Sequence, residues 1–386
     1  MTKEDFKDFI SKQDFKAPLG FGICKLDLGR DGNVLQAIYP FLNWEGENLG
    51  SYAVFCSCAK NIIAQNESEA IYEINLDFLN KALNLFSPFL SEALENKNTH
   101  KNIQIILELQ KIKDLKNFRF VVLYKDSKCL SVESAYMKLM ALSLGKAKLR
   151  SLNLEGIFGL LQNVAWSGNT PYELSYLREN EISLKLNGTY PRIDFVDKFP
   201  RYLMHVIPQY DNIRLLDSSK TRFGAYLGSG GYTQMPGASY VNFNSGVLGE
   251  CMNEGRISSS VIVGNGTDIG GGASILGVLS GGNSTPITIG ENCLLGVNSA
   301  TGISLGDGCI VDGGIAILAG TVIFIESSEA KKIKEINIDF KINENNLYKG
   351  RELSGKNGIH FRFNSKEGRM IAFRSKVEIK LNKDLH

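Results

Sequence analysis

A six-residue period of apolar side chains runs through residues 257–323 of this 386-residue chain. Neither an α-helix, which repeats about every 3.6 residues, nor a strand, which repeats every two, produces this period. Hexads are typical of a parallel β-helix, whose triangular coil takes three hexads and points one branched apolar side chain per hexad inward. The apolar positions fall into three runs: Ile257, Val263, Ile269 and Ile275; Ile289 and Leu295; and Leu305, Val311, Ile317 and Ile323.

Glycine is concentrated in the same region, since 24 of the 39 glycines lie in residues 221–320. The stretch VIVGNGTDIGGGAS (261–274) has the G-x-G spacing of a phosphate-binding loop. A dinucleotide-binding loop leads into an amphipathic helix, however, whereas the residues after this stretch continue the hexad pattern. We therefore interpret most of these glycines as corner residues, which relieve crowding and positive φ.

The period is interrupted twice. Ile275 and Ile289 are fourteen residues apart, so GVLSGGNSTP (277–286) is expected to bulge from the coil as a loop that either carries function or absorbs an insertion. Residues 221–256 are also off the period, and Asn242 and Asn244 there are interpreted as corner residues that tolerate a left-handed conformation.

The flanks of the repeat differ from it. Residues 77–97 and 132–152 have apolar side chains at helical spacing, and residues 118–126 read as a buried strand. We predict an α/β region over 1–205, a parallel β-helix over 206–325 and a small C-terminal β segment over 326–386. The basic and apolar residues of 348–386 form either a small antiparallel sheet with a solvated face or a clamp on an anionic ligand, with Lys349, Arg351, Arg362 and Lys366 as donors.

Composition excludes several classes of protein. A net charge of +2 gives no reason to expect a nucleic-acid or membrane partner, and no window has the ~18 consecutive apolar residues of a membrane helix. No signal peptide is visible at the N-terminus. Seven scattered cysteines fit reduced thiols in a cytoplasm, and the four histidines form no zinc-ligand pattern with them.

Polar residues are dense just before the regular repeat, in residues 240–260. Glu254 lies two residues from Arg256, as either a solvated pair or part of a site. Because no Ser/His/Asp or Cys/His arrangement is visible, a carboxylate is the more natural general base. Cys251 is interpreted as a small buried hydrophobe rather than a nucleophile.

Several motifs resemble those of the tetrahydrodipicolinate N-succinyltransferases in their longer form. The resemblance is dense over 131–365 and thin over 1–130, and NEGRIS, GGGASILGVLSGG and RELSG with FRFNS are its most specific parts. The matching stretches are SVESAYMKLMALSL (131–144), LNLEGIFGLLQNVAW (152–166), VDKFPRYL (196–203), YVNFNSG (240–246), NEGRIS (253–258), VGNGTDIGGGASILGVLSGG (263–282), ITIGENCLLGVNS (287–299), GISLGDGCIVDGG (302–314), LAGT (318–321), RELSG (351–355) and FRFNS (361–365).

The resemblance implies a left-handed parallel β-helix that assembles as a cytoplasmic homotrimer with active sites between subunits. It implies transfer of a succinyl group from succinyl-CoA, as co-substrate, to tetrahydrodipicolinate, with ring opening by water. The product is N-succinyl-2-amino-6-oxopimelate, in lysine and diaminopimelate biosynthesis. No permanently bound cofactor, nucleic acid or membrane partner is expected.

Residue roles follow from the same resemblance. Glu254 matches the catalytic glutamate; it acts as a base or transiently carries the acyl group, and we favour the base because a thioester is already activated. Arg256 matches a residue that binds the acyl donor through the succinyl carboxylate. Further matches to donor-binding positions are Gly271, Ser274, Asp312, Gly313 and Gly320, and at the CoA end Lys349, Arg362, Phe363, Asn364 and Ser365.

The chain departs from the family pattern at three places. Glutamate is expected where Asp312 stands, and a second arginine where Phe363 stands, so the contacts with CoA differ there. Relatives of the longer form can hold a metal ion with acidic residues on the trimer axis. The corresponding stretch GGYTQMPGASY (230–240) has no Asp or Glu, so no metal site is predicted.

Two alternatives remain. The same fold could use acetyl-CoA as an N-acetyltransferase, although acetyl has no distal carboxylate for Arg256 to bind. A non-catalytic hexapeptide scaffold or a carbonic-anhydrase-like metal module is the second. That module needs histidines on the β-helix, and none lies between residues 206 and 359.

Overall fold

The computed structural model describes residues 1–278, 285–376, 379 and 381. The chain forms two compact units. The first comprises Met1–Ala141 and Leu152–Pro200, and the second comprises Leu142–Ser151 and Arg201–His386. The division into residues 1–205, 206–325 and 326–386 stays a prediction.

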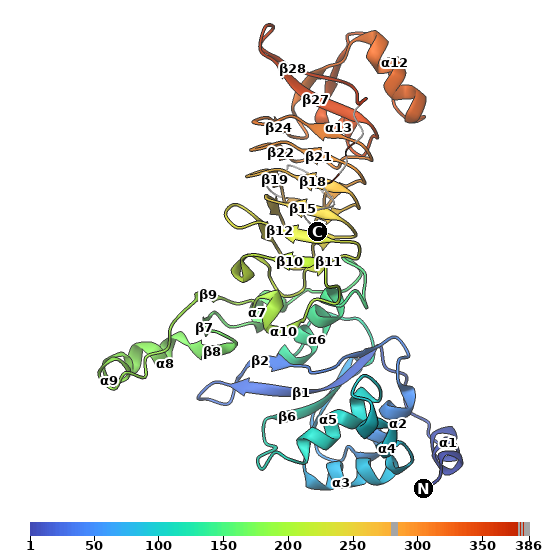
Figure 1. Ribbon diagram of the computed structural model, residues 1–386, viewed down its shortest axis with the longest axis vertical. Helices are drawn as coiled ribbons and strands as arrows, with labels where there is room; N and C mark the ends of the chain where they lie inside the picture. Colours follow the sequence, from blue (N-terminus) through green and yellow to red (C-terminus); the bar gives the residue numbers. More distant parts are fainter. Residues whose placement is uncertain (279–284, 377–378, 380, 382–386) are drawn as a thin grey trace. The chain divides into compact units, whose positions relative to one another are not determined.

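The first unit is built on an antiparallel sheet of order β2-β1-β6-β5-β4, with β3 paired to β1 (Figure 1). The predicted buried strand is confirmed as β6, which lies at the centre of the sheet with residues 120–123 buried. The strands are β1 (Gly20–Leu28), β2 (Val34–Ile38), β3 (Asn43–Trp44), β4 (Ile62–Gln65), β5 (Glu69–Glu73) and β6 (Phe118–Leu123).

An aromatic core joins this sheet to its helices. The Phe55 ring packs within 5.5–5.9 Å of Phe78, Phe86 and Phe120. These aromatic side chains are buried and anchor the helical layer to the sheet. The helices of the unit are α1 (Lys3–Ser11), α2 (Leu49–Cys58), α3 (Leu76–Leu85), η1 (Ser87–Phe89), α4 (Leu90–Glu95), α5 (Lys101–Leu109), α6 (Val132–Ser143, shared with the second unit), α7 (Ile157–Leu160), α8 (Leu174–Glu179) and α9 (Glu181–Leu186).

Two segments with helical spacing are shorter helices than the pattern suggests. Residues 77–97 are divided into α3, η1 and α4, because Pro88 has no amide hydrogen to donate and stands at the break. The second segment, 132–152, is helical only to Ser143. Gly145 follows with a φ of +68°, which ends the helix.

A second, small sheet completes the first unit. It has the order β8-β7-β9, with both pairings antiparallel. Its strands are β7 (Val164–Ser167), β8 (Thr170–Glu173) and β9 (Phe195–Asp197).

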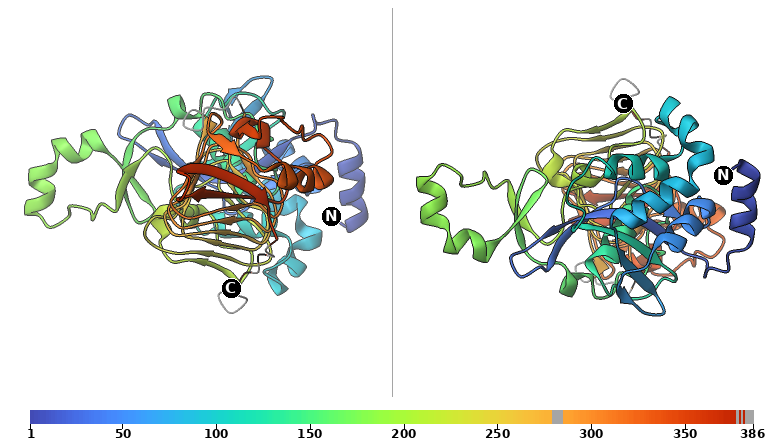
Figure 2. Two further views of the ribbon diagram at one scale, coloured as in Figure 1. Left: turned by 90° about the horizontal axis from the view of Figure 1, so that it is seen from above. Right: turned by 90° about the horizontal axis from the view of Figure 1, so that it is seen from below.

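The second unit contains the parallel β-helix (Figure 1). Seen end-on, its coils lie over one another (Figure 2). Short strands of successive coils pair in parallel to form three sheets, which we call sheets I, II and III. Sheet I contains β10 (Ile213–Leu215), β12 (Tyr232–Gln234), β15 (Cys251–Asn253), β18 (Thr267–Ile269), β21 (Leu294–Leu295) and β23 (Ile310–Val311); sheet II contains β13 (Tyr240–Val241), β16 (Arg256–Ile257), β19 (Ser274–Ile275), β22 (Ala300–Thr301) and β24 (Ala316–Ile317); sheet III contains β11 (Tyr226–Leu227), β14 (Gly246–Val247), β17 (Ile262–Val263) and β20 (Thr288–Ile289).

The register of sheet II locates the extra length in one coil. Arg256 pairs with Ser274, and Ala300 pairs with Ala316, so these two coils are of similar length. The coil between them is longer, since Ser274 pairs with Ala300. The additional residues fall between β19 and β20, where the period breaks, although residues 279–284 of the predicted bulge lie outside the described residues.

The first coils are off the hexad period because their interior is partly polar. Tyr232, Gln234 and Asn253 are fully buried inside the coil. The Asn253 amide donates to the Tyr232 hydroxyl at 3.0 Å, and that hydroxyl donates to Gln234 Oε1 at 3.1 Å. Hydrogen bonding offsets the cost of burying these groups, so hydrophobicity alone does not mark the inward positions.

The two predicted corner asparagines differ. Asn244 has a φ of +54°, as expected for a left-handed corner residue. Asn242 is not among the residues with positive φ; its side-chain oxygen accepts a hydrogen bond from the Phe243 amide at 2.9 Å. The left-handed interpretation is therefore confirmed for Asn244 and wrong for Asn242.

The C-terminal segment continues sheet I rather than standing apart from it. β27 (Ile359–Asn364) pairs in parallel with β23 and forms an antiparallel hairpin with β28 (Arg369–Arg374). The edge is completed by β25 (Val322–Phe324) and β26 (Leu347–Lys349). The helical segments of the second unit that lie wholly within the described residues are α10 (Tyr202–His205), η2 (Ser218–Lys220), α12 (Ser327–Ile336) and α13 (Gly350–Leu353).

A membrane-crossing helix is not found: none of the helices in the described ranges has both the length and the apolar character required. A cytoplasmic location stays a prediction.

Candidate active site

Several of the predicted site residues share one edge of the β-helix, the corner between sheets I and II. Parallel register stacks Asn253, Ile269, Leu295, Val311 and Phe361 on successive strands of sheet I. The residues that follow each of these occupy the same corner of successive coils, which we call the I–II corner. Glu254, Asp312 and Arg362 thus lie in one column that spans four strand spacings, about 19 Å, and Gly271 lies at the same corner, one residue further along its coil.

The coil turns unusually tightly at Glu254. Asn253 and Ile257 are separated by three residues, whereas their partners in the next coil, Ile269 and Ile275, are separated by five. A Cβ atom at Gly255 would lie 2.4 Å from the Ala273 carbonyl oxygen, so only glycine fits this turn. Residues 254–256 of the off-period NEGRIS stretch therefore form a short corner, which stacks on the longer corner of the next coil, residues 270–274.

The backbone of Glu254 is fixed on both sides. Its amide donates to the Ile269 carbonyl at 2.9 Å, and its carbonyl accepts from the Gly272 amide at 3.1 Å. The half-buried carboxylate has no hydrogen-bond or ion-pair partner within the part of the chain that the structure describes. A Cβ atom placed on Gly271 would lie 3.9 Å from Glu254 Oε2, so the carboxylate lies beside bare backbone.

Arg256 lies directly opposite Ser274 in the sheet II register. Its Nε donates to the Ser274 hydroxyl at 2.9 Å, and the side chain is otherwise exposed. The hydrogen bond orients a guanidinium whose remaining donors can bind a carboxylate. The structure therefore brings together Glu254, Arg256, Gly271 and Ser274.

Asp312 and Arg362 are also together, and His360 joins them. Arg362 Nε lies 2.6 Å from Asp312 Oδ2, and His360 Nε2 lies 2.6 Å from Asp312 Oδ1. Burial opposes ionisation of Asp312, but hydrogen bonds from Arg362 and His360 outweigh it and hold the pKa of this carboxyl below its usual value. His360 has no counterpart among the predicted residues; its position two residues before Arg362 on one strand is the signal that could have indicated it.

A cavity of about 580 Å³ opens at the upper end of the I–II corner. Asp312, Gly313 and Phe363, all predicted to bind the acyl donor, line it. Phe363 is 48% exposed, so it offers an apolar surface where the family pattern has arginine.

Four predicted residues lie away from this column. Gly320 follows sheet II strand β24, and Lys349 ends the edge strand β26. These two are near each other, because the Gly350 amide donates to the Thr321 carbonyl at 2.9 Å. Asn364 and Ser365 belong to the hairpin turn, where the Asn364 carbonyl accepts from the Gly368 amide at 2.8 Å.

Cys251 is fully buried in the coil interior. Burial, with a smaller contribution from the charge of Asp268, raises the pKa of this thiol well above its usual value. It is therefore a small apolar residue here, as predicted, and not a thiolate nucleophile.

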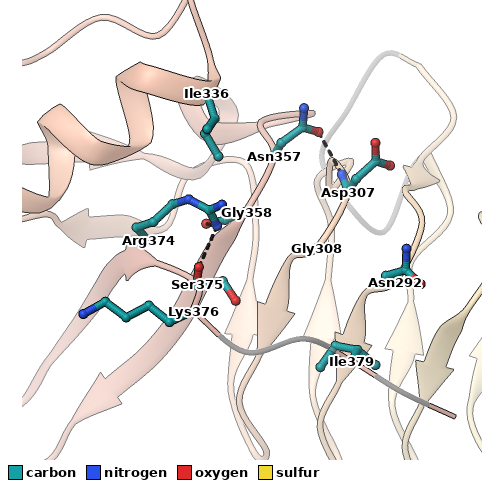
Figure 3. Close-up of a pocket in the computed structure, with 10 residues that line it drawn as sticks. All are labelled: Asn292, Asp307, Gly308, Ile336, Asn357, Gly358, Arg374, Ser375, Lys376 and Ile379. Atoms are coloured by element: carbon teal, nitrogen blue, oxygen red, sulfur yellow. Dashed lines mark hydrogen bonds between the residues drawn. The ribbon is translucent and has the colours of Figure 1, made fainter.

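A larger pocket, of about 640 Å³, lies at the corner between sheets III and I (Figure 3). Asn292, Asp307, Gly308 and Asn357 form its β-helix side, and Arg374 approaches from β28 (Figure 3). The residues predicted for acyl transfer do not line it. Size alone therefore does not identify the site.

Metal ligands are not gathered anywhere in the described ranges: no group of three or more His, Cys, Asp or Glu side chains is arranged to hold an ion.

The family models that match the chain are the tetrahydrodipicolinate N-succinyltransferase N-terminal domain over residues 2–159, its middle domain over 161–201, and the hexapeptide repeat of succinyl-transferase over 286–319. The N-terminal match extends the family through the region in which recognisable motifs are thin.

Full-length relatives agree with these matches. The 2,3,4,5-tetrahydropyridine-2,6-dicarboxylate N-succinyltransferase of Helicobacter pylori is 64% identical, over 99% of each chain. The protein of the same name from Campylobacter jejuni is 50% identical, over 100% of this chain and 99% of its own. A Campylobacter jejuni crystal structure, described as a putative 2,3,4,5-tetrahydropyridine-2-carboxylate N-succinyltransferase, superposes with a TM-score of 0.90 at 48% identity over 98% of this chain and 99% of that one. The chain belongs to the tetrahydrodipicolinate N-succinyltransferase family.

Proposed function

We propose that this protein transfers the succinyl group of succinyl-CoA to the amine of tetrahydrodipicolinate, in lysine and diaminopimelate biosynthesis. The products are N-succinyl-2-amino-6-oxopimelate and free CoA, and ring opening consumes one water. The observation that carries the proposal is 64% identity to a named N-succinyltransferase over 99% of both chains. The I–II corner supports it, because it offers a carboxylate without a partner in the described structure, beside the bare backbone of Gly271, and an oriented arginine.

Glu254 is the general base of this reaction. Water first adds across the C=N bond of the acceptor, so that its nitrogen carries a proton. The nitrogen then attacks the thioester carbonyl, a C–N bond forms, and Glu254 takes the proton that the nitrogen loses. The C–S bond then breaks, and the leaving thiolate of CoA receives that proton. Because the carboxylate lies beside Gly271, the thioester can approach the backbone closely at the point where the base is held.

Arg256 selects the succinyl group. Its guanidinium is oriented by Ser274 and carries donors directed to solvent, so it can bind the distal carboxylate of a succinyl chain. An acetyl group offers nothing to this arginine. The same site therefore favours succinyl-CoA over acetyl-CoA.

The rest of the donor extends along the corner toward β27. Asp312 holds Arg362, which keeps further guanidinium donors for the phosphates of CoA, and Gly313 and Phe363 line the adjoining cavity. Gly320, Lys349, Asn364 and Ser365 lie off this column. They complete the donor site as edge contacts.

The functional assembly is a homotrimer with active sites between subunits. A coil with one inward apolar residue per hexad buries little surface alone, and packing against other copies removes more apolar area from water. Light scattering should give about three times the subunit mass of 42.6 kDa. A monomer at micromolar concentration would contradict the assembly.

The decisive experiment measures release of free CoA from succinyl-CoA, with and without tetrahydrodipicolinate. Acceptor-dependent thiol release is expected with succinyl-CoA and far less with acetyl-CoA. Faster release with acetyl-CoA would support an N-acetyltransferase, and no acceptor-dependent release from either donor would overturn the proposal.

A further inference from the structure

A second carboxylate, that of Asp268, lies next to the predicted base. Its strand neighbours Thr267 and Ile269 are fully buried in the coil, so alternation along β18 directs Asp268 outward. In the pairing of β15 with β18, Asp268 lies opposite Met252. Glu254 follows Met252 by two residues in the same coil. A strand spacing of about 4.8 Å and a rise of about 3.3 Å per residue place the two Cα atoms about 8 Å apart.

The described residues around Asp268 offer no partner. Its register neighbours on the two adjacent coils are Met252 and Leu294, which are apolar and half-buried. Asp268 itself is also half-buried. Across the described ranges, no hydrogen bond or ion pair reaches its carboxylate. A carboxylate that is half-buried between apolar side chains costs stability, and such a cost is common at functional sites.

Few titratable groups face Asp268. From β15 and the turn after it these are Glu254 and the buried thiol of Cys251, and β21 contributes only leucines. Burial, and then the charge of Glu254, raise the pKa of Asp268 above its usual value. The charge of Glu254 thus acts on Asp268, and the two carboxylates share one local field.

We propose that Asp268 is a positioning residue for the acceptor, whose carboxylate binds the protonated nitrogen of tetrahydrodipicolinate and holds it beside Glu254. The proposal rests on the proposed function. Asp268 has no other partner among the described residues, so a cation supplies its missing counter-charge, and Asp268 turns the nitrogen toward the base. The bound nitrogen releases one proton to solvent before it attacks, and its second proton passes through Glu254 as described above, so Asp268 itself neither gains nor loses a proton in the acyl transfer.

Kinetics of Asp268→Asn, which keeps the shape and removes the charge, test the proposal. We expect the KM for tetrahydrodipicolinate to rise about ten- to a hundredfold, the loss typical of a charge-assisted hydrogen bond, with the KM for succinyl-CoA unchanged. Asp268→Glu restores the charge and should recover part of the loss. Asp307→Asn is the matched control, because Asp307 lies at a different corner and an asparagine keeps the oxygen that accepts from the Glu291 amide.

The pH dependence gives a second readout. As pH falls through the raised pKa of Asp268, the carboxyl becomes neutral, so the wild-type KM for the acceptor should rise. In Asp268→Asn this KM should already be high and flat over the same range. The thermal midpoint of Asp268→Asn at pH 7 should equal or exceed that of the wild type, because an unpaired charge has been removed.

Several results would overturn the proposal. An acceptor KM within twofold of wild type in Asp268→Asn would do so, as would an equal rise for both substrates. If Asp268→Asn fails to fold, the wild-type profile decides, and an acceptor KM that stays flat as pH falls is contrary to the proposal. Loss of all acceptor-dependent CoA release in the wild type would instead defeat the proposed function.

Discussion

Two corners of the same β-helix use polar side chains in opposite ways. At the corner between sheets III and I, three polar side chains are bonded to the backbone of the neighbouring coil. Asn265 accepts from the Glu250 amide at 2.6 Å, Asp307 accepts from the Glu291 amide at 2.8 Å, and Asn357 accepts from the Asp307 amide at 2.8 Å. At the lower end of the I–II corner, the carboxylate of Glu254 has no partner among the described residues, and neither has that of Asp268 on the adjoining strand β18.

The difference separates side chains that build the coil from side chains that are available for a ligand. A side-chain oxygen that satisfies a backbone amide stabilises the stacking of coils and has less capacity for chemistry. A half-buried carboxylate without a donor stabilises nothing and is free to accept a proton or bind a cation. Substitutions at the two corners should therefore affect different measurements.

The largest effect is expected for Glu254→Gln at the I–II corner. Glutamine keeps the shape and reach but accepts no proton at neutral pH, so kcat should fall about 10²–10⁴-fold. Folding and CoA affinity should be unchanged, because the carboxylate bonds to nothing in the described structure and only the backbone of Glu254 is tied to the next coil. Steady-state kinetics and calorimetry with CoA measure the two quantities.

Cys251→Ser is the control for a covalent route. The Cys251 thiol is buried and its pKa is raised, so the variant should keep its activity. More than about a tenth of the wild-type kcat in Glu254→Gln would show that Glu254 is not the base. An inactive Cys251→Ser with active Glu254→Gln would place the chemistry on the thiol.

A smaller effect is expected for Arg256→Ala. The lost contact is a charge-assisted hydrogen bond worth about 1.5–3 kcal/mol, so the KM for succinyl-CoA should rise roughly ten- to over a hundredfold. The KM for acetyl-CoA should barely change, because acetyl has no distal carboxylate. Ser274→Ala, which removes only the hydroxyl that orients Arg256, should give an intermediate value. Equal changes for both donors would show that Arg256 does not bind the acyl tail.

The repeat predicts most of the β-helix, because one buried position per hexad is a local property of the sequence. The predicted inward residues Ile257, Val263, Ile269 and Ile275 are all fully buried. The first coils are not predicted in the same way, because hydrogen-bonded polar side chains fill part of their interior. In the first unit, Pro88 interrupts a helix whose apolar spacing continues across the break.

The sequence predicts the site residues that fall within one short motif, but not those that are brought together by the register of the strands. Glu254 and Arg256 fall within one short motif. Asp268 is brought to Glu254 by the pairing of β15 with β18, and His360 is brought to Asp312 by the pairing of β23 with β27. Such pairs depend on the length of each coil, which differs from one coil to the next, so the sequence alone does not determine which residues stack.

The smallest effect is expected at the corner between sheets III and I, for Asn265→Ala. This substitution removes Asn265 Oδ1, which accepts a hydrogen bond from the Glu250 amide at an N–O distance of 2.6 Å. Water can replace this acceptor because Asn265 is exposed. A cost of about 1 kcal/mol is expected, which lowers the thermal midpoint by about 2–4 °C for a unit of this size. Differential scanning calorimetry measures the shift, and kcat and both KM values should stay within twofold of wild type.

Asn265 and Asp268 lie three residues apart in one coil, so their variants compare the two corners directly. Asn265→Ala should lower stability and leave catalysis intact, and Asp268→Asn should weaken acceptor binding without lowering stability. The contrast depends on the hydrogen-bond partner of each side chain. Asn265 has its partner in the adjacent coil, and Asp268 has none in the described structure. If Asn265→Ala impairs turnover while the thermal midpoint is unchanged, a bonded corner also serves catalysis and the separation of roles between the two corners is wrong.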